Sequence, residues 1–159
     1  MVTVVREYKQ GDLEAVVALF GRSVHEVASR HYSPAQIAAW APRIPDWPAW
    51  SRSLAEGAVF VCERKGRIAG FIRMEDNGYL DLLYVDPDFQ RQGVARELLD
   101  RVLAWASDQC ISRISSDVSI TARPFFEQAG FRVVTPQIVE WNGASFHNFR
   151  MERSLTQSP

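Results

Sequence analysis

The chain has 159 residues, of which 47% are hydrophobic and 23% charged, and its formal net charge is −1. This composition excludes an intrinsically disordered chain, and the near-zero net charge gives no general attraction to nucleic acid or to an anionic membrane. No apolar run approaches the roughly 18 residues of a membrane span. We therefore expect a single domain over residues 1–155 with a disordered tail at 156–159.

The cysteine and histidine spacing excludes a metal site. Cys62 and Cys110 lie far apart and lack the spacing of metal ligands. His25 and His31 are six residues apart, whereas the H-E-x-x-H pattern needs four. Unpaired thiols are typical of a reducing compartment, and the N-terminus lacks the pattern of a secretory signal. We expect a cytoplasmic protein that binds no metal, nucleic acid or membrane.

Hydrophobic spacing and turn residues divide the chain into helical and extended segments. Apolar residues three and four positions apart predict helices, and short alternating or β-branched runs predict strands. The expected elements, in chain order, are a strand at 2–8, helices at 13–29 and 34–41, a packed loop at 41–50, a short helix at 54–56, strands at 58–64, 67–75 and 79–85, a helix from 93, a strand at 113–120, a helix at 121–130 and a hairpin at 131–153.

This order of elements predicts an α/β (α+β mixed) fold. We expect a central mixed, mostly antiparallel sheet of about seven strands, flanked by about four helices, with one βαβ unit at its centre. Gly70, inside the strand at 67–75, indicates a bulge or a close backbone contact.

The strand at 79–85 leads through a short loop into the helix that begins at Gly93. The first N–H groups of a helix have no intrahelical partner, and the helix dipole adds partial positive charge there. Gly93 lets the backbone approach a bulky anion, and the small Ala95 keeps that approach open. The sequence therefore predicts an anion site at this helix start.

The string Gln90–Ala95 resembles the acetyl-CoA signature of the GNAT superfamily of N-acetyltransferases, Q/R-x-x-G-x-G/A. Further along, Ala122–Phe131 resembles the second motif of that superfamily, a helix followed by Gly-Phe. The order of elements also matches over nearly the whole chain. Tyr32-Ser33-Pro34 and Asn148-Phe149-Arg150 are similar to the bacterial YafP-type branch, whose substrate is poorly defined. The resemblance implies a GNAT-like sheet, splayed at a bulge in a central strand, and N-acetyltransferase activity.

The resemblance further implies acetyl-CoA as the cosubstrate and coenzyme A as the product. Backbone N–H groups of residues 91–95 would cradle the pyrophosphate, and Arg96 either reaches a cofactor phosphate or is a solvated surface arginine. The strands would splay near a bulge within 82–85, where an N–H of Leu83 or Tyr84 stabilises the oxyanion of the thioester carbonyl. The implied cofactor-binding residues are Leu83, Tyr84, Val85, Gln90, Arg91, Gln92, Gly93, Val94, Ala95, Arg96, Ser119 and Phe126.

The acceptor of such an enzyme is an amine, which must lose a proton before it reacts, because the pKa of an alkylamine is near ~10.4. Strand periodicity places Tyr79, Asp81 and Leu83 on one face. We expect Asp81 to be the general base, with Glu75 and Asp76 as the next candidates.

Two residues depart from the family pattern. Phe126 stands where the family has a tyrosine that protonates the leaving thiolate, and Ser119 stands where an asparagine is usual. Tyr84, Tyr32 or Ser119 could replace the missing acid. No cysteine lies in either motif, so we expect direct transfer in a ternary complex. The alternative is a non-catalytic acyl-CoA-binding or sensing module.

The acceptor pocket is the least defined part of the sequence. His31, Tyr32, Trp40 and Glu75 are its candidate residues, although packing in the core or at a helix end is the favoured explanation for the first three. A small molecule or a peptide amine remains open as the acceptor, as does a monomer or a homodimer.

Overall fold

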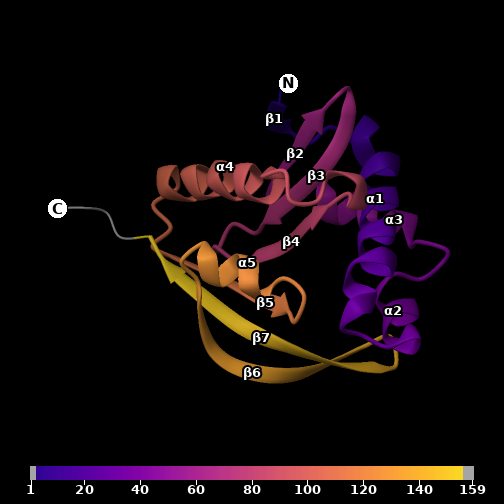
Figure 1. Cartoon of the computed structure of the whole chain (residues 1–159). Coiled ribbons are helices and arrows are strands. Elements are labelled where there is room, and N and C mark those ends of the chain that lie inside the picture. The colour runs from indigo at the N-terminus through magenta and orange to yellow at the C-terminus, as the bar shows by residue number, and fades with distance from the viewer. Residues whose placement is uncertain (1–2, 156–159) are drawn as a thin grey trace.

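The computed structural model describes residues 3–155 of the chain (Figure 1). The expected tail at 156–159 lies outside the described residues. In chain order the strands and helices are β1 (Thr3–Glu7), α1 (Leu13–Glu26), α2 (Pro34–Trp40), α3 (Trp47–Leu54), β2 (Ala58–Arg64), β3 (Arg67–Met74), β4 (Leu80–Val85), α4 (Val94–Asp108), β5 (Arg113–Ser119), α5 (Arg123–Gln128), β6 (Arg132–Trp141) and β7 (Ala144–Ser154), with short 3-10 helices at Gln10–Asp12, Ala28–Arg30 and Pro87–Phe89.

The strands form two antiparallel sheets in place of the expected single sheet. The first has the order β1-β2-β3-β4 and the second the order β5-β7-β6. Their edge strands β4 and β5 meet at one parallel bridge, between Tyr79 and Ser115, and diverge beyond it (Figure 1). The mixed α/β fold, its seven strands and its central splay are confirmed within the described residues, which hold five α-helices where about four were expected.

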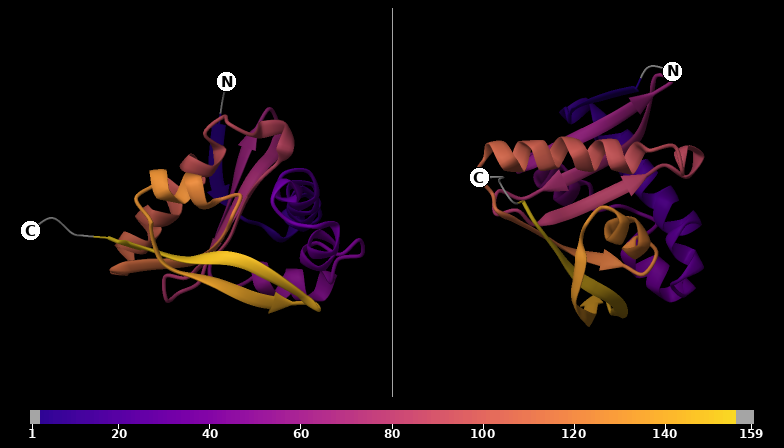
Figure 2. Two further views of the ribbon diagram at one scale, coloured as in Figure 1. Left: turned by 60° about the horizontal axis from the view of Figure 1, so that its bottom comes forward. Right: turned by 60° about the vertical axis from the view of Figure 1, so that its left-hand side comes forward.

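Helices cover both faces of the first sheet. Figure 2 shows α4 and α5 on one side of it and α1 to α3 on the other. Phe60 and Cys62 of β2 belong to the apolar cluster beneath α4 and α5, and Val59 and Val61 belong to the cluster beneath α1 to α3. Because both faces are buried, residues 58–62 of β2 form an unbroken apolar run and not an alternating one.

Local capping residues explain where the N-terminal helices begin. Ser33 accepts a hydrogen bond from the Gln36 N–H at 3.2 Å, which caps α2 at the predicted place. The prediction of a loop over 41–50 is wrong in its second half, where α3 begins at Trp47. Asp46 caps α3 by accepting the Ala49 N–H at 3.1 Å. Pro48 lies in the first turn, where the missing N–H costs nothing, so it begins this helix.

Gly70 has both of the features expected of it. The pairing of β2 with β3 skips Ala69, so a bulge lies directly beside the glycine. A Cβ at Gly70 would lie 2.8 Å from Val94 Cγ1 of α4 and 2.9 Å from the Tyr84 carbonyl oxygen. The glycine therefore allows α4 to lie close against the sheet.

A second bulge lies in β4, at Asp81. The pairing with β3 passes from Arg73–Leu82 to Met74–Leu80, so Asp81 is the extra residue. The resemblance placed this bulge within 82–85, and the structure places it one residue earlier. An extra residue bends the strand and interrupts its alternation, which bears directly on the candidate site.

Two further findings concern the described residues only. Over residues 3–155 no helix is long and apolar enough to cross a membrane. In the same range no three His, Cys, Asp or Glu side chains gather in an arrangement that could hold a metal ion.

Candidate active site

The loop from β4 to α4 is fixed in place by Asp86, whose side chain is 1% exposed. Its carboxylate accepts the Asp88 N–H at 2.9 Å and forms an ion pair with Arg22 of α1. Its own N–H donates to the Ala69 carbonyl of β3 at 2.8 Å, and the ring of Phe89 is buried below the loop. The loop that leads to the predicted anion site is therefore held by the sheet, by α1 and by the core.

Two left-handed residues shape the start of α4. Arg91 has φ of 59° and Gly93 has φ of 81°, so both lie in the region that a glycine adopts at no steric cost. Gln92 lies between them. The first helical hydrogen bond onto the Gly93 carbonyl comes from the Glu97 N–H at 3.0 Å. The N–H groups of the residues before Glu97 therefore precede the hydrogen-bonded part of the helix and are available as donors.

The side chains around this surface differ in exposure. Val94 is buried against the sheet, and Gln90 is exposed, with its Nε2 donating to the Val85 carbonyl at 3.1 Å. Arg96 is exposed and pairs with Asp100 one turn later, with Nε 3.3 Å from Oδ1. The structure therefore places Arg96 on the solvent side of α4, where its present partner is a carboxylate.

The free edge of β4 lies directly before this loop. In an antiparallel pair, alternate residues direct both backbone groups to the same neighbour. Val85 is paired with Gly70 of β3, and the next residue, Asp86, donates its N–H to the Ala69 carbonyl of β3. This bond shows which residues of this segment form backbone hydrogen bonds with β3: Asp86 and, two residues earlier, Tyr84. Leu83 and Val85 therefore direct their N–H and C=O groups away from β3, towards the space that β5 leaves, whereas Tyr84 directs its groups to β3.

Asp81 accepts a hydrogen bond from Arg73 Nη1 at 2.9 Å. Arg73 and Phe71 are two residues apart on β3 and therefore lie on the same face. Phe71 belongs to the cluster beneath α1 to α3, whereas Leu83 packs against the cluster beneath α4. The prediction that Asp81 and Leu83 share a face is therefore wrong, because the bulge shifts the alternation of β4. The carboxylate lies on the side of the sheet that α1 to α3 cover.

Burial raises the pKa of Asp81, and the charge of Arg73 and its hydrogen bond oppose that shift. Arg73 also donates from Nε to the carbonyls of Ser53 at 2.8 Å and Glu56 at 3.3 Å. Its Nη1 also lies 3.5 Å from Glu75 Oε1. The side chain of Glu75 is 43% exposed and that of Asp81 30%, so Asp81 is the more buried of the two carboxylates. Arg73 thus holds the carboxylate of Asp81 in one place.

An aromatic cluster adjoins Asp81 on the same side of the sheet. Trp40 Nε1 donates to Tyr84 Oη at 3.2 Å, and the rings of Trp40 and Tyr32 are 5.3 Å apart. Tyr32 Oη donates to the His147 carbonyl at 2.6 Å and accepts the Ile120 N–H at 3.0 Å. Burial raises the pKa of Tyr84 and of Tyr32. Among the described residues no acceptor lies within reach of the Tyr84 hydroxyl proton.

The other candidates lie around α5. His31 Nδ1 is 2.8 Å from Thr121 Oγ1 at the surface. Ser119 Oγ accepts the Ala122 N–H at 3.1 Å, and its hydroxyl therefore stabilises the turn before α5. Phe126 is 4% exposed and belongs to the core cluster beneath α4. The structure thus places Phe126 inside the core, away from solvent.

The sequence reasoning missed a polar network on the second sheet. Asp117 of β5 accepts from Tyr79 Oη at 2.7 Å and from Gln137 Nε2 at 2.6 Å, and Arg150 Nε is 3.4 Å away. Burial, and then the hydrogen bond to Asp117, raises the pKa of Tyr79. Arg73 was missed as well. Its position could have predicted it, because Arg73 is a charged residue in a strand that is apolar on both faces, and a buried charge needs a fixed partner.

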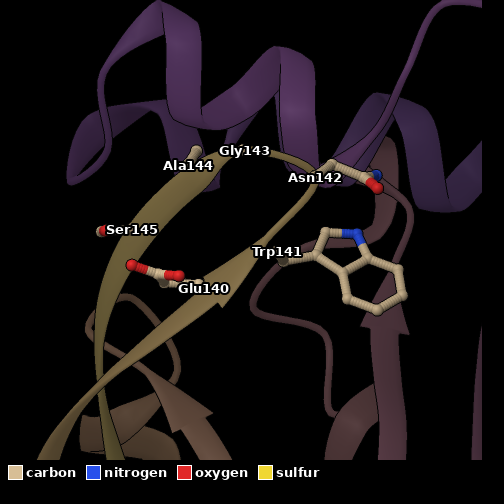
Figure 3. Close-up of a pocket in the computed structure, with 6 residues that line it drawn as sticks. All are labelled: Glu140, Trp141, Asn142, Gly143, Ala144 and Ser145. Atoms are coloured by element: carbon tan, nitrogen blue, oxygen red, sulfur yellow. The ribbon is translucent and has the colours of Figure 1, made fainter.

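A hollow at the turn between β6 and β7 lies apart from these residues (Figure 3). It is lined by residues 140–145. Asn142 Nδ2 donates to the Ala39 carbonyl of α2 at 3.0 Å, so the turn is attached to α2. Trp141, 61% exposed, extends beside the turn (Figure 3). No residue predicted for the site lines this hollow.

The family model of the acetyltransferase (GNAT) domain matches residues 28–153 of the chain. The chain belongs to the GNAT family. This match includes β4, the loop that leads into α4 and the second motif, and it confirms the resemblance inferred from the sequence. The chain is accordingly a member of an N-acetyltransferase family.

Related proteins cover nearly the whole GNAT chain. The uncharacterized N-acetyltransferase YafP of Escherichia coli (strain K12) is 42% identical over 147 residues, which are 92% of this chain and 93% of YafP. The crystal structure of a GCN5-related N-acetyltransferase from Rhodopseudomonas palustris superposes with a TM-score of 0.93 at 26% identity, covering 98% of this chain and 97% of that one. The PaiA N-acetyltransferase of Thermoplasma acidophilum, solved with coenzyme A, superposes at 0.80 with 17% identity over 97% and 99% of the two chains.

Proposed function

We propose that this GNAT protein transfers an acetyl group from acetyl-CoA directly to a primary amine. The observation that carries the proposal is the adjacency of two features on β4 and α4. Leu83 and Val85 direct their backbone N–H and C=O groups into the open edge, where the Val85 carbonyl already accepts a hydrogen bond from Gln90 Nε2. The loop with left-handed residues at 91 and 93 presents further N–H donors directly beyond. An extended amide chain fits the first feature, and a pyrophosphate fits the second.

Acetyl-CoA joins an amide-containing arm and a pyrophosphate in one molecule, and when bound it supplies an activated acetyl thioester. The coenzyme A complex of the Thermoplasma acidophilum relative supports this ligand for the same fold. In our proposal the N–H groups of residues 91–95 bind the pyrophosphate. Gln90 lies beside them, and the β4 edge from Leu83 to Val85 binds the arm.

Asp81 is the proposed general base. Because burial raises its pKa, its carboxylate is a stronger base than an exposed one and better matched to accepting a proton from an ammonium group. Leu83 is the proposed oxyanion donor, since its N–H faces the open edge whereas that of Tyr84 faces β3. A fixed N–H at this position stabilises the negative charge that develops on the carbonyl oxygen.

The departing thiolate requires little help. A thiol has a pKa near ~8.5, so its anion leaves without full protonation. Phe126 has no proton to donate and lies in the core. The Tyr84 hydroxyl beside Trp40 still has its proton, but burial raises its pKa, which makes it a weaker acid than the thiol. We therefore propose that the thiolate leaves without a proton from a tyrosine.

A covalent acetyl-cysteine route is disfavoured. Burial, and then the charge of Glu97, raises the pKa of the Cys62 thiol to about 11. A thiol in that state is a poor nucleophile at neutral pH. Direct transfer between two bound substrates is therefore the proposed mechanism.

The cofactor half of the proposal is tested by thermal unfolding with and without coenzyme A. At a concentration about 100 times its dissociation constant, a ligand stabilises a protein by about 2.7 kcal/mol, so the melting temperature of the wild-type protein is expected to rise by several degrees. Gly93→Ala is expected to lose most of this rise. Alanine adopts the φ of 81° found at Gly93 only with strain, so the N–H groups of residues 91–95 would move from the positions proposed to bind the pyrophosphate.

Gly143→Ala is the matched control, since Gly143 also has a positive φ, of 80°, and has open space around a Cβ. Both variants carry the same backbone strain, and only Gly93→Ala is expected to weaken coenzyme A binding. Equal losses in both variants, or no rise in the wild-type protein, would contradict the cofactor assignment.

Turnover separates the enzyme from its alternative, an acyl-CoA-binding module, which the buried Phe126 at the usual acid position favours. Release of thiol from acetyl-CoA, measured with a panel of amines, is expected for the enzyme. Tight coenzyme A binding with no thiol release on any amine of the panel would support the binding module instead.

A further inference from the structure

Arg64, the last residue of β2, carries a buried guanidinium directly beneath the loop at the start of α4. Its side chain is 8% exposed. Nη1 donates to the Gln92 carbonyl at 2.6 Å, Nη2 to Glu97 Oε2 at 3.1 Å, and Nε to Thr3 Oγ1 at 3.1 Å. Each nitrogen of this guanidinium therefore has a partner, and two of the three partners belong to the proposed pyrophosphate cradle or to the first turn behind it.

The bond to the Gln92 carbonyl determines where the next N–H points. The Gln92 C=O and the Gly93 N–H belong to one planar trans peptide unit, in which they point in opposite directions. Because Arg64 holds the carbonyl inwards, the Gly93 N–H points outwards. Because Gly93 has no Cβ and tolerates a positive φ as well as a negative one, this peptide unit could rotate in the absence of such a partner.

The bond to Glu97 removes an unfavourable charge. Glu97 lies in the first turn of α4 and is 42% exposed, so its carboxylate would repel an anion bound at that helix start. The guanidinium at 3.1 Å compensates that charge. Cys62 Sγ, 3.7 Å from the same carboxylate oxygen, adds a weak donor on the side of the core.

We infer that Arg64 is a positioning residue of the cofactor site: it aims the Gly93 N–H at the pyrophosphate and neutralises Glu97 behind it. This inference rests on the proposed function, because it assumes that the cradle binds coenzyme A. Arg64 lies on the core side of the loop and acts through the loop backbone.

The test compares two acetyl donors on the Arg64→Gln variant. Acetyl-CoA carries the pyrophosphate, and S-acetylpantetheine carries the same thioester without it. Loss of one hydrogen bond to a charged group weakens binding roughly ten- to a hundredfold. We expect the Kd of coenzyme A and the KM of acetyl-CoA to rise by that factor, while kcat/KM with S-acetylpantetheine and the KM of the amine stay within about twofold.

Arg6→Gln is the matched control, because Arg6 also forms paired contacts, to Asp12 at 2.8 Å and Glu63 at 3.2 Å, on the neighbouring strand. It is expected to lower the melting temperature without changing coenzyme A affinity. The double variant Arg64→Gln/Glu97→Gln is expected to recover part of the affinity, because it removes the exposed carboxylate. Arg64→Lys is expected to lie between the wild-type protein and Arg64→Gln.

Two outcomes would overturn the inference: unchanged coenzyme A affinity in Arg64→Gln, or an equal loss with both acetyl donors, which indicates general distortion. If the double variant binds coenzyme A as weakly as Arg64→Gln does, the claim that Arg64 acts by neutralising Glu97 is wrong. If the wild-type protein itself fails to bind coenzyme A, the proposed function fails, and that result is distinct from all of these.

Discussion

Arg64 and Arg73 are buried cations in neighbouring strands of the first sheet, each 7% exposed. A buried charge without a partner is costly, so each guanidinium is satisfied by carbonyl and carboxylate oxygens. Arg64 reaches the loop that begins α4, and Arg73 reaches the carboxylate of Asp81. At the scale of single residues, the two halves of the proposed site are therefore each fixed by one arginine.

The residue-scale prediction concerns the pH dependence of activity. Asp81→Asn is expected to lower kcat by about 10²- to 10⁴-fold, the usual contribution of a general base. Activity of the wild-type protein is expected to rise with pH through the pKa of Asp81, because only the ionised carboxylate accepts a proton. Since burial raises this pKa and Arg73 lowers it, Arg73→Gln is expected to move the rise to higher pH. The pH profile of kcat/KM measures the shift.

Asp108→Asn is the control for this prediction, because Asp108 is an exposed carboxylate at the C-terminal end of α4. It is expected to keep wild-type activity and an unchanged pH profile. An acidic limb that persists in Asp81→Asn would assign the base to another group, of which Glu75 is the nearest carboxylate bonded to Arg73.

At the scale of elements, the contact of β3 with α4 decides how the helix start meets the sheet. Gly70 provides the space for Val94 and Leu98 of α4, since a Cβ there would lie 2.8 Å from one side chain and 3.1 Å from the other. The first turns of α4 therefore pack directly against the backbone of Gly70. The position of the helix depends on packing against the sheet as well as on its own sequence.

Gly70→Ala is expected to destabilise the protein by about 1–3 kcal/mol, the usual cost of overpacking a core. Gly21→Ala is the matched control, because Gly21 lies inside α1 with no atom within 4 Å of a Cβ. That change is expected to stabilise by about 0.5–1 kcal/mol. Thermal or denaturant unfolding of both variants measures the difference, and stabilisation by Gly70→Ala would refute the packing argument.

At the scale of the whole molecule, the proposed site lies where two sheets that meet at one end diverge at the other. The bridge between Tyr79 and Ser115 closes one end. Near the open end, Tyr32 Oη joins the backbone of β7 at His147 to that of Ile120 after β5. One hydroxyl from the segment before α2 therefore holds two parts of the second sheet relative to the helices.

Tyr32→Phe is expected to cost about 1–3 kcal/mol, because the Ile120 N–H and the His147 carbonyl each lose a partner. The melting temperature should fall by about 2–4 °C for each kcal/mol. Tyr8→Phe is the control, since the Tyr8 hydroxyl makes no side-chain hydrogen bond within residues 3–155, and it is expected to change stability by less. Equal shifts in the two variants would show that the bridge contributes nothing.

The sequence by itself determined the order of the elements, the tight turns, the start of α4 at Gly93 and the family. Each of these depends on local chemistry: spacing of apolar residues, capping, and a backbone that only Gly93 relaxes without strain. The first part of α3, from Trp47, was missed because a proline can either end a helix or begin one. Here Asp46 caps the helix directly before Trp47, so Pro48 lies in its first turn.

Tertiary structure alone decided the rest. The bulge at Asp81 moved its carboxylate to the face opposite Leu83, and no pattern within β4 announces an extra residue, since the pairing with β3 creates it. The partners of Arg64 and Arg73, and the division of the strands into two sheets, likewise depend on residues far apart in the chain. Local sequence specifies local conformation, whereas register, buried charge pairs and the open edge of β4 arise only when the strands pack together.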